Sequence, residues 1–118
     1  MAVKVGNIRT YKGNDGSVGI RVDRSSILGN PFHMYHGEDD RDRVCDQYDN
    51  YFDMRMSSKE DTVFKQEVQR ILNYARYRDV TLLCWCYPQR CHAETIKKYI
   101  ETKLEEMKDE PIEVSREV

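Results

Sequence analysis

The chain has 118 residues, a net charge of −2 and a sequence pI near 5.9. Hydrophobic residues make up 39% of it and charged residues 34%, and the apolar residues fall in periodic runs, which excludes a disordered chain. The small negative charge excludes a general electrostatic attraction to nucleic acid or to a membrane surface. The length suits one modest core, so we predict a single domain over residues 1–110 and a C-terminal tail over 111–118.

Alternating apolar and polar residues predict two strands near the start of the chain. These strands cover residues 3–8 and 17–23, and the sequence GNDG at 13–16 is typical of a turn. We therefore predict that the two strands form a β-hairpin. The segment ILGNPF at 27–32 follows, and its glycine, asparagine and proline favour a tight turn, while its apolar residues predict that the loop packs against the protein.

Helical spacing of apolar residues predicts two helices in the middle of the chain. The first begins with Asp39 or Asp40 as its cap and runs to about Asp53, with a stripe made of Val44, Tyr48, Tyr51 and Phe52. The second follows the cap signature SSKED at 57–61 and runs to about Tyr77. Its buried face consists of Phe64, Val68, Ile71, Leu72 and Ala75.

A continuous apolar run at residues 79–85 predicts a buried strand. A third helix is expected from His92 or Ala93 to Pro111, with a buried face made of Ala93, Ile96, Ile100, Leu104 and Met107. This order of elements favours an α/β fold in which the N-terminal hairpin and the strand at 79–85 form a small sheet covered by about three helices. The last strand and the last helix then form a Rossmann-like strand-loop-helix unit.

Three of the four cysteines and one of the three histidines lie close together in LLCWCYPQRCHAETI, residues 82–96. They follow a predicted buried strand and precede a predicted helix, which is where open α/β sheets bind ligands. The N-terminus of a helix attracts anions and lowers the pKa of a thiol. Cys91 beside His92 would therefore suit a catalytic thiol.

Two other interpretations of the cysteines stay open. Cys84, Cys86, Cys91 and His92 could ligate zinc, and the distant Cys45, His33 or His36 could complete such a site. Alternatively, the cysteines are small buried apolar residues. This is the expectation for Cys84, which continues the apolar strand, and for Cys45. The longest apolar run is too short for a membrane helix, and the start of the chain does not resemble a signal peptide. We therefore predict a cytoplasmic protein. Because thiols are kept reduced in the cytoplasm, a structural disulfide is not expected.

Two motifs resemble an uncharacterised phage and bacterial family, the domain of unknown function numbered 4326. Its members are similar to GR-x-S-x-LGNPF followed by L-x-CWC-x-P-x-x-CH, and the resemblance spans roughly residues 3 to 104. The matching residues are Leu28, Gly29, Asn30, Pro31 and Phe32, then Cys84, Trp85, Cys86, Pro88, Cys91 and His92. The family usually has a glycine and an arginine before the first motif. This chain has Asp23 where the glycine is usual, and Arg24 corresponds to the arginine. Ala93 and Glu94 replace a glycine and an aspartate.

The resemblance implies a small α/β domain with both motifs near each other, often encoded by phages. We expect the two motifs to form a pocket for a phosphate-bearing ligand, such as a nucleotide or a related nucleic-acid group, bound by Arg24, Asn30, Arg90 and His92. One alternative is a phage protein that binds and modulates a host protein through its charged helices and its Tyr48, Tyr51 and Phe52 region. Another is a zinc-stabilised structural module. The sequence leaves open whether the protein is an enzyme or contacts nucleic acid. Zinc is a possible cofactor, and no membrane partner is expected. If the protein is encoded by a phage, it is expected to act in the host cytoplasm.

Overall fold

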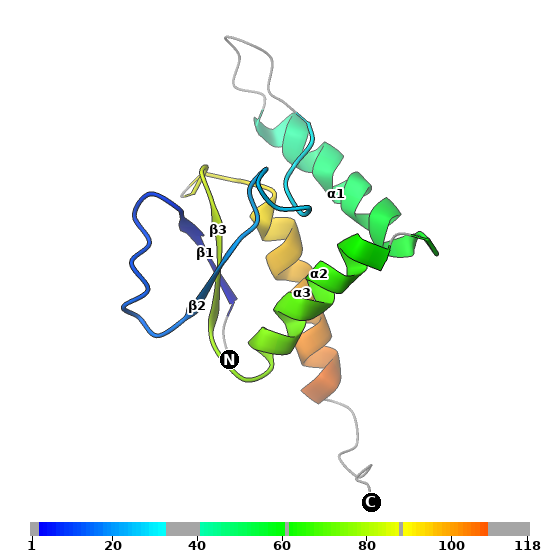
Figure 1. Ribbon diagram of the computed structural model, residues 1–118. Helices are drawn as coiled ribbons and strands as arrows, with labels where there is room; N and C mark the ends of the chain where they lie inside the picture. The colour runs from blue at the N-terminus through cyan, green and yellow to red at the C-terminus, as the bar shows by residue number, and fades with distance from the viewer. Residues whose placement is uncertain (1–2, 33–40, 61, 88, 109–118) are drawn as a thin grey trace, which may run out of the picture.

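The computed structural model describes residues 3–32, 41–60, 62–87 and 89–108. These residues form strands β1 (Val3–Asn7), β2 (Val18–Arg21) and β3 (Val80–Cys84) and helices α1 (Arg41–Ser57), α2 (Thr62–Ala75) and α3 (Ala93–Lys108). The predicted α/β fold is confirmed, including the strand-loop-helix unit made by β3 and α3 (Figure 1). The predicted caps Asp39 and Asp40 and the tail at 111–118 lie outside the described residues.

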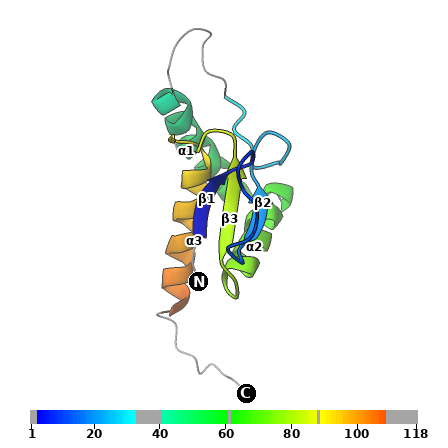
Figure 2. The same ribbon diagram turned by 90° about the vertical axis from the view of Figure 1, so that its left-hand side faces the viewer.

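Strand β3 lies in the centre of a parallel sheet, between β1 and β2 (Figure 2). Val3 and Val18, at the starts of the outer strands, both stand opposite Val80. Every residue of β3 is buried, whereas β1 and β2 mix buried and more exposed positions. A strand buried on both faces belongs in the middle of a sheet.

The predicted N-terminal hairpin is therefore wrong, because β1 and β2 run parallel and each pairs with β3 instead. The turn at GNDG does exist, since Gly13 and Gly16 have φ angles of 74° and 82°. The turn lies within the connection that leads from β1 across β3 to β2, so it does not join two paired strands. Alternation of apolar and polar residues identifies a strand, but it does not say which strand lies beside it.

Residues 8–17 cover the face of the sheet that the helices leave open, on the left in Figure 1. Tyr11 lies over Gly19, where an added Cβ would come within 2.5 Å of the tyrosine ring. The Tyr11 hydroxyl donates to the carbonyl oxygen of Ser17 over 2.9 Å. The Ser17 hydroxyl in turn lies 2.7 Å from that of Thr81 on β3. This segment explains why β3 is buried although helices lie on only one side of the sheet.

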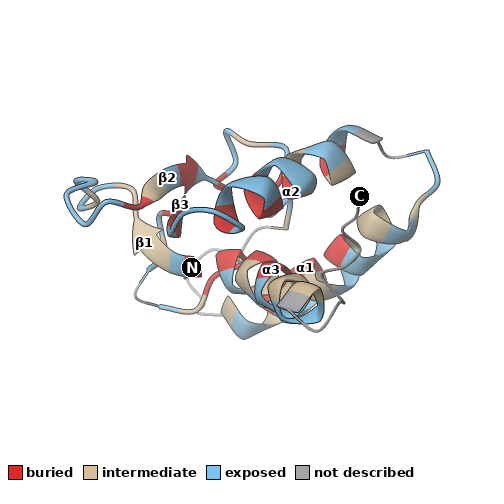
Figure 3. Cartoon of the chain, turned by 90° about the horizontal axis from the view of Figure 1, so that it is seen from below, coloured by how far each residue is buried: buried red, intermediate tan, exposed pale blue. Residues whose placement is uncertain are grey.

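Helices α2 and α3 pack side by side on the opposite face (Figures 1 and 3). Every residue of the predicted α2 face is buried, and on α3 Ala93, Ile96 and Ile100 are buried while Leu104 and Met107 are partly buried. Helix α1 packs against α2 and α3 near the carboxyl ends of the strands. Within the described ranges, no helix combines the length and the hydropathy needed to cross a membrane.

The aromatic stripe of α1 belongs to the hydrophobic core. Val44, Tyr48 and Phe52 are buried, and Tyr51 is partly buried. The rings of Tyr48 and Phe52 lie 6.1 Å apart, and the Phe52 ring also meets that of Phe64 on α2 at 5.7 Å. These side chains join α1 to the rest of the domain, which leaves little of the Tyr48, Tyr51 and Phe52 region exposed, and the binding of a host protein stays a prediction.

Candidate functional site at the carboxyl edge of the sheet

The carboxyl ends of all three strands lie at one edge of the sheet, since the strands are parallel. Asn7 is the last residue of β1, and its amide nitrogen donates to the carbonyl oxygens of Trp85 at 3.1 Å and of Tyr87 at 2.9 Å. Asp23 follows β2 and accepts a hydrogen bond from the indole nitrogen of Trp85 at 2.9 Å. The two outer strands therefore hold the turn after β3 from both sides.

Asp23 is a buried carboxylate with several donors. Arg21 pairs with it at 2.6 Å, and Ser25 donates to it at 2.6 Å in addition to the Trp85 contact. The bond from Arg21 is the main reason why the pKa of Asp23 lies well below its usual range. Neither Asn7 nor Asp23 was among the site residues predicted from the sequence. The available signal was that each is a polar residue placed directly at the end of a strand.

The three clustered cysteines converge where β3 ends and α3 begins. Cys84 and Cys91 are buried, and their sulfur atoms lie 2.6 Å apart. Cys86 is half-buried and lies close enough to Cys91 for that thiol to lower its pKa. All four cysteines of the chain are free thiols. The expectation of buried side chains at Cys84 and Cys45 is confirmed.

The surroundings of both Cys84 and Cys86 favour a thiolate, and the hydrogen bond from Cys91 lowers the pKa of Cys84 to about 7. The hydrogen bond from Cys91 is the largest of the influences that lower the pKa of Cys86 to about 6, and the positive charges of Arg41 and Arg24 add to it. The hydrogen bonds of Cys91 to Cys84 and Cys86, and after them its burial, raise the pKa of Cys91. Cys91 is thus the hydrogen-bond donor of the cluster, and Arg41 and Arg24 add positive charge near Cys86. The sequence pointed to Cys91 as the reactive thiol.

The described donors do not fit zinc in this arrangement. Zinc with bonds of about 2.3 Å to sulfur in a tetrahedral site keeps its sulfur ligands roughly 3.7 Å apart, whereas Cys84 and Cys91 are separated by 2.6 Å. Among the described residues, no group of three or more His, Cys, Asp or Glu side chains is placed to hold a metal ion. The predicted distant ligands His33 and His36 lie outside the described residues.

His92 contacts the core of the domain. Its Nε2 nitrogen makes a short hydrogen bond to the carbonyl oxygen of Val22, and because a carbonyl can only accept, Nε2 carries the proton. The imidazole ring meets the ring of Tyr48 edge-on at 5.0 Å. Burial lowers the pKa of His92, so the neutral form is favoured at neutral pH. The Tyr48 hydroxyl donates to the carbonyl oxygen of Leu28 over 2.7 Å, and the two sequence motifs are thereby joined through His92 and Tyr48.

The lowered pKa of His92 predicts a loss of stability in mild acid. In the unfolded chain the histidine takes up a proton below about pH 6.5, whereas the folded chain resists protonation, so acidification favours unfolding. Between pH 7 and pH 5.5 this group should reduce the free energy of unfolding by up to about 1.2 kcal/mol. Urea denaturation at both pH values tests this. His92→Gln should reduce the pH dependence, and a double variant of His33 and His36 should keep it; equal pH dependence in all three proteins would contradict the prediction.

Asn30 and Arg24 shape the LGNPF loop from within. Asn30 is buried, its amide nitrogen donates to the carbonyl oxygen of Val44 at 3.2 Å, and its side-chain oxygen accepts from the backbone nitrogen of Phe32 at 2.9 Å. The Arg24 guanidinium donates to the carbonyl oxygens of Asn30 at 3.0 Å and of Phe32 at 3.1 Å. Arg24 remains exposed, and Asn30 has the role of a turn residue that also contacts α1.

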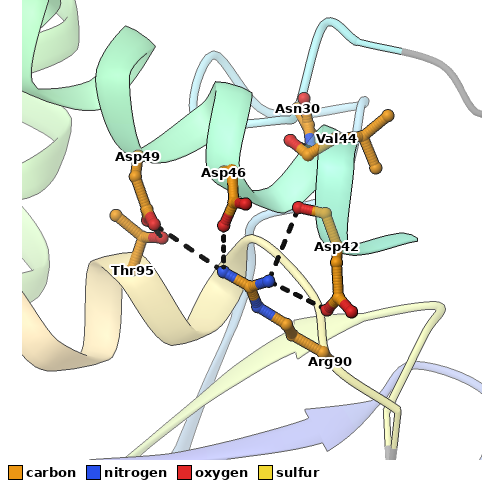
Figure 4. Close-up of polar contacts among 7 residues, drawn as sticks. All are labelled: Asn30, Asp42, Val44, Asp46, Asp49, Arg90 and Thr95. Atoms are coloured by element: carbon orange, nitrogen blue, oxygen red, sulfur yellow. Dashed lines mark hydrogen bonds and ion pairs between the residues drawn. The ribbon is translucent and has the colours of Figure 1, made fainter. Parts of the chain in front are cut away.

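Arg90 connects the turn after β3 to helix α1 (Figure 4). Its guanidinium lies 2.9 Å from a carboxylate oxygen of Asp42, 2.9 Å from one of Asp46 and 3.7 Å from one of Asp49. These aspartates are spaced four and three residues apart, which places them on one face of the helix. The hydroxyl of Thr95 on α3 also donates to Asp49. The positive charge of Arg90 is thus already neutralised within the protein.

Replacing Arg90 with alanine should weaken the contact between α1 and the turn after β3. The partners are largely exposed, so we expect a loss of only about 1 kcal/mol in the free energy of unfolding, which decreases in high salt. Arg90→Lys should recover part of that loss, because an ammonium group cannot pair with several carboxylates through a planar fork. Thermal denaturation at low and high salt measures both. Arg78→Ala is the matched control, and an equal loss in that variant would contradict the assignment.

The two motifs therefore meet, and the groove that Arg90 lines is not shared by the other three predicted ligand residues. A groove of about 1010 Å³ is lined by residues that include Asp49, Tyr87, Arg90, Cys91 and Thr95. That lining contains neither Arg24, Asn30 nor His92. Arg90 thus lies on the side of the turn that faces α1, α3 and β1, whereas Arg24 lies on the side that faces β2 and the LGNPF loop.

Comparison with known proteins gives one match. The model of the family described as "Domain of unknown function (DUF4326)" matches residues 6–102. No curated protein and no solved structure matches the chain.

Proposed function

We propose that this chain, which belongs to the DUF4326 family, binds a phosphate-bearing ligand at the carboxyl edge of the sheet. The binding residues are Arg24 and Arg41. The observation that carries the proposal is that the exposed Arg24 is held in place by its hydrogen bonds to the carbonyl oxygens of Asn30 and Phe32. Arg24 follows β2 and Arg41 starts α1, and the positive charges of both lower the pKa of the half-buried Cys86, which indicates that the two arginines lie near one place.

The position of this pair agrees with the general behaviour of parallel sheets. Ligands of open α/β folds bind beyond the carboxyl ends of the strands, and the start of α3 adds backbone donors and the positive end of its dipole. An arginine also suits phosphate because its planar donors can bind two phosphate oxygens together. Arg90 is not part of this proposal, because three aspartates surround its guanidinium. Asn30 and His92 contribute by fixing the loop and the start of α3.

Titration of the isotope-labelled chain with ADP, UMP and a short oligonucleotide, followed by NMR, tests the proposal. We expect chemical shift changes at Arg24, Arg41 and Cys86 with at least one ligand. Arg24→Gln and Arg41→Gln should each weaken that binding about tenfold, as loss of one charge-assisted hydrogen bond does. Arg78→Gln is the matched control on the opposite edge of the sheet. Unchanged affinity in both arginine variants, shifts confined to the groove beside Arg90, or no shifts with any ligand would overturn it.

A further inference from the structure

The three clustered cysteines have an arrangement that ligand binding does not require. Cys91 is the central member, since its sulfur lies 2.6 Å from that of Cys84 and its thiol also influences the pKa of Cys86, two residues after Cys84. Non-bonded sulfur atoms do not normally approach so closely, and a disulfide bond is about 2.05 Å long. The two sulfur atoms are therefore close enough for a disulfide bond to form between them when an oxidant is supplied.

The three thiols also differ in access. Cys84 and Cys91 are buried, whereas Cys86 is half-buried and lies beside the cations Arg24 and Arg41. A thiolate attacks only a disulfide that it can reach, and positive neighbours favour the thiolate form. The arrangement provides a more accessible thiol, Cys86, close in the chain to a buried pair whose sulfur atoms are in contact.

We infer that Cys84, Cys86 and Cys91 form a thiol–disulfide exchange site, in which Cys86 accepts a disulfide from a small-molecule or protein substrate and the Cys84–Cys91 pair retains it. The inference concerns a second activity and does not require the phosphate-bearing ligand.

The exchange balances in three steps. The Cys86 thiolate attacks a sulfur of the substrate disulfide, a mixed disulfide forms, and one substrate thiolate leaves. Cys91 then attacks the Cys86 sulfur and passes its proton to the second departing thiolate. Finally Cys84 attacks the Cys91 sulfur, which forms the Cys84–Cys91 bond, and its proton restores Cys86. Two protein thiols are oxidised overall, and one substrate disulfide is reduced to two thiols.

Incubation of the full chain with oxidised and reduced glutathione tests the inference. After acid quenching and alkylation, mass spectrometry should show the loss of two hydrogen atoms and a peptide pair linked through Cys84 and Cys91. Cys86 and Cys45 should stay open to alkylation, and excess reduced glutathione should reverse the change. This mapping uses the unaltered chain, so it does not depend on the folding of a variant.

Three variants test the order of events. Cys86→Ser should slow formation of the bond at least about tenfold, because the buried pair then has to react directly. Cys91→Ser should accumulate a glutathione adduct on Cys86 that is not resolved. Cys45→Ser is the matched control and should react at the rate of the unaltered chain. Four alkylated cysteines at every glutathione ratio, a bond that includes Cys45, or an unchanged rate in Cys86→Ser would overturn the inference. None of these results bears on nucleotide titration, so the two proposals fail independently.

Discussion

Replacing Tyr48 with alanine is expected to lower the free energy of unfolding by about 4 kcal/mol, the range found for loss of a large buried aromatic side chain. Tyr48 is fully buried, and its ring contacts those of Tyr51, Phe52 and His92. Its hydroxyl donates to the carbonyl oxygen of Leu28. The substitution therefore opens a cavity and separates α1, the LGNPF loop and the start of α3 together. Urea denaturation monitored by circular dichroism measures the loss.

Tyr48→Phe separates packing from hydrogen bonding. It retains the ring and leaves the Leu28 carbonyl without its donor, which should cost about 1–2 kcal/mol. Tyr77→Ala is the matched control, because Tyr77 is 68% exposed and exposed positions usually change stability by less than about 0.5 kcal/mol. If Tyr48→Ala were no more destabilising than Tyr77→Ala, the position of Tyr48 at the centre of the three segments would be wrong.

Replacing Gly29 with alanine should cost about 3 kcal/mol, because the new Cβ would collide with backbone rather than with a movable side chain. It would lie 2.5 Å from the carbonyl oxygen of Asp23 and 2.6 Å from the Cα of Arg24. Overpacking against rigid atoms usually costs about 1–3 kcal/mol. The melting temperature should fall by roughly 10 °C in a chain of this size. Scanning calorimetry gives the shift directly.

Gly16→Ala is the control that separates a steric collision from backbone strain. Gly16 has a φ of 82°, but nothing lies within 4 Å of a Cβ added there. Its replacement should cost only about 1 kcal/mol for the left-handed conformation. A larger loss at Gly16 than at Gly29 would contradict the close packing of the LGNPF loop against the end of β2. This packing explains why the motif needs glycine beside Leu28, although the sequence alone suggested only a turn.

The periodicity of the chain predicted its helices well. All five residues of the predicted α2 face are buried, and the strand expected at 79–85 is β3. The location of the cysteines between a strand and a helix was also predictable, since it follows from local sequence. These features are readable because burial of a side chain depends mainly on its own hydrophobicity and on the spacing of its neighbours.

The pairing of strands and of charges was not predictable in this way. Whether β1 lies beside β2 or beside β3 depends on contacts between residues far apart in the chain, and an alternating pattern is compatible with both. Arg90 was interpreted as an anion ligand because it precedes a helix, but Asp42 and Asp46, more than forty positions earlier, neutralise it. The three aspartates on one face of α1 were a signal of such a partner, without indicating which cation it would be.

By itself the sequence determined that this protein is a small α/β domain with its cysteines at a strand-to-helix junction. Only the tertiary structure decided that the sheet is parallel, that Arg90 joins α1 to the turn after β3, and that Cys84 and Cys91 lie in contact. The physical reason is that the burial of a residue depends mainly on its own side chain and on nearby positions in the sequence. The chemistry of a charge or a thiol depends instead on the neighbours that folding brings to it.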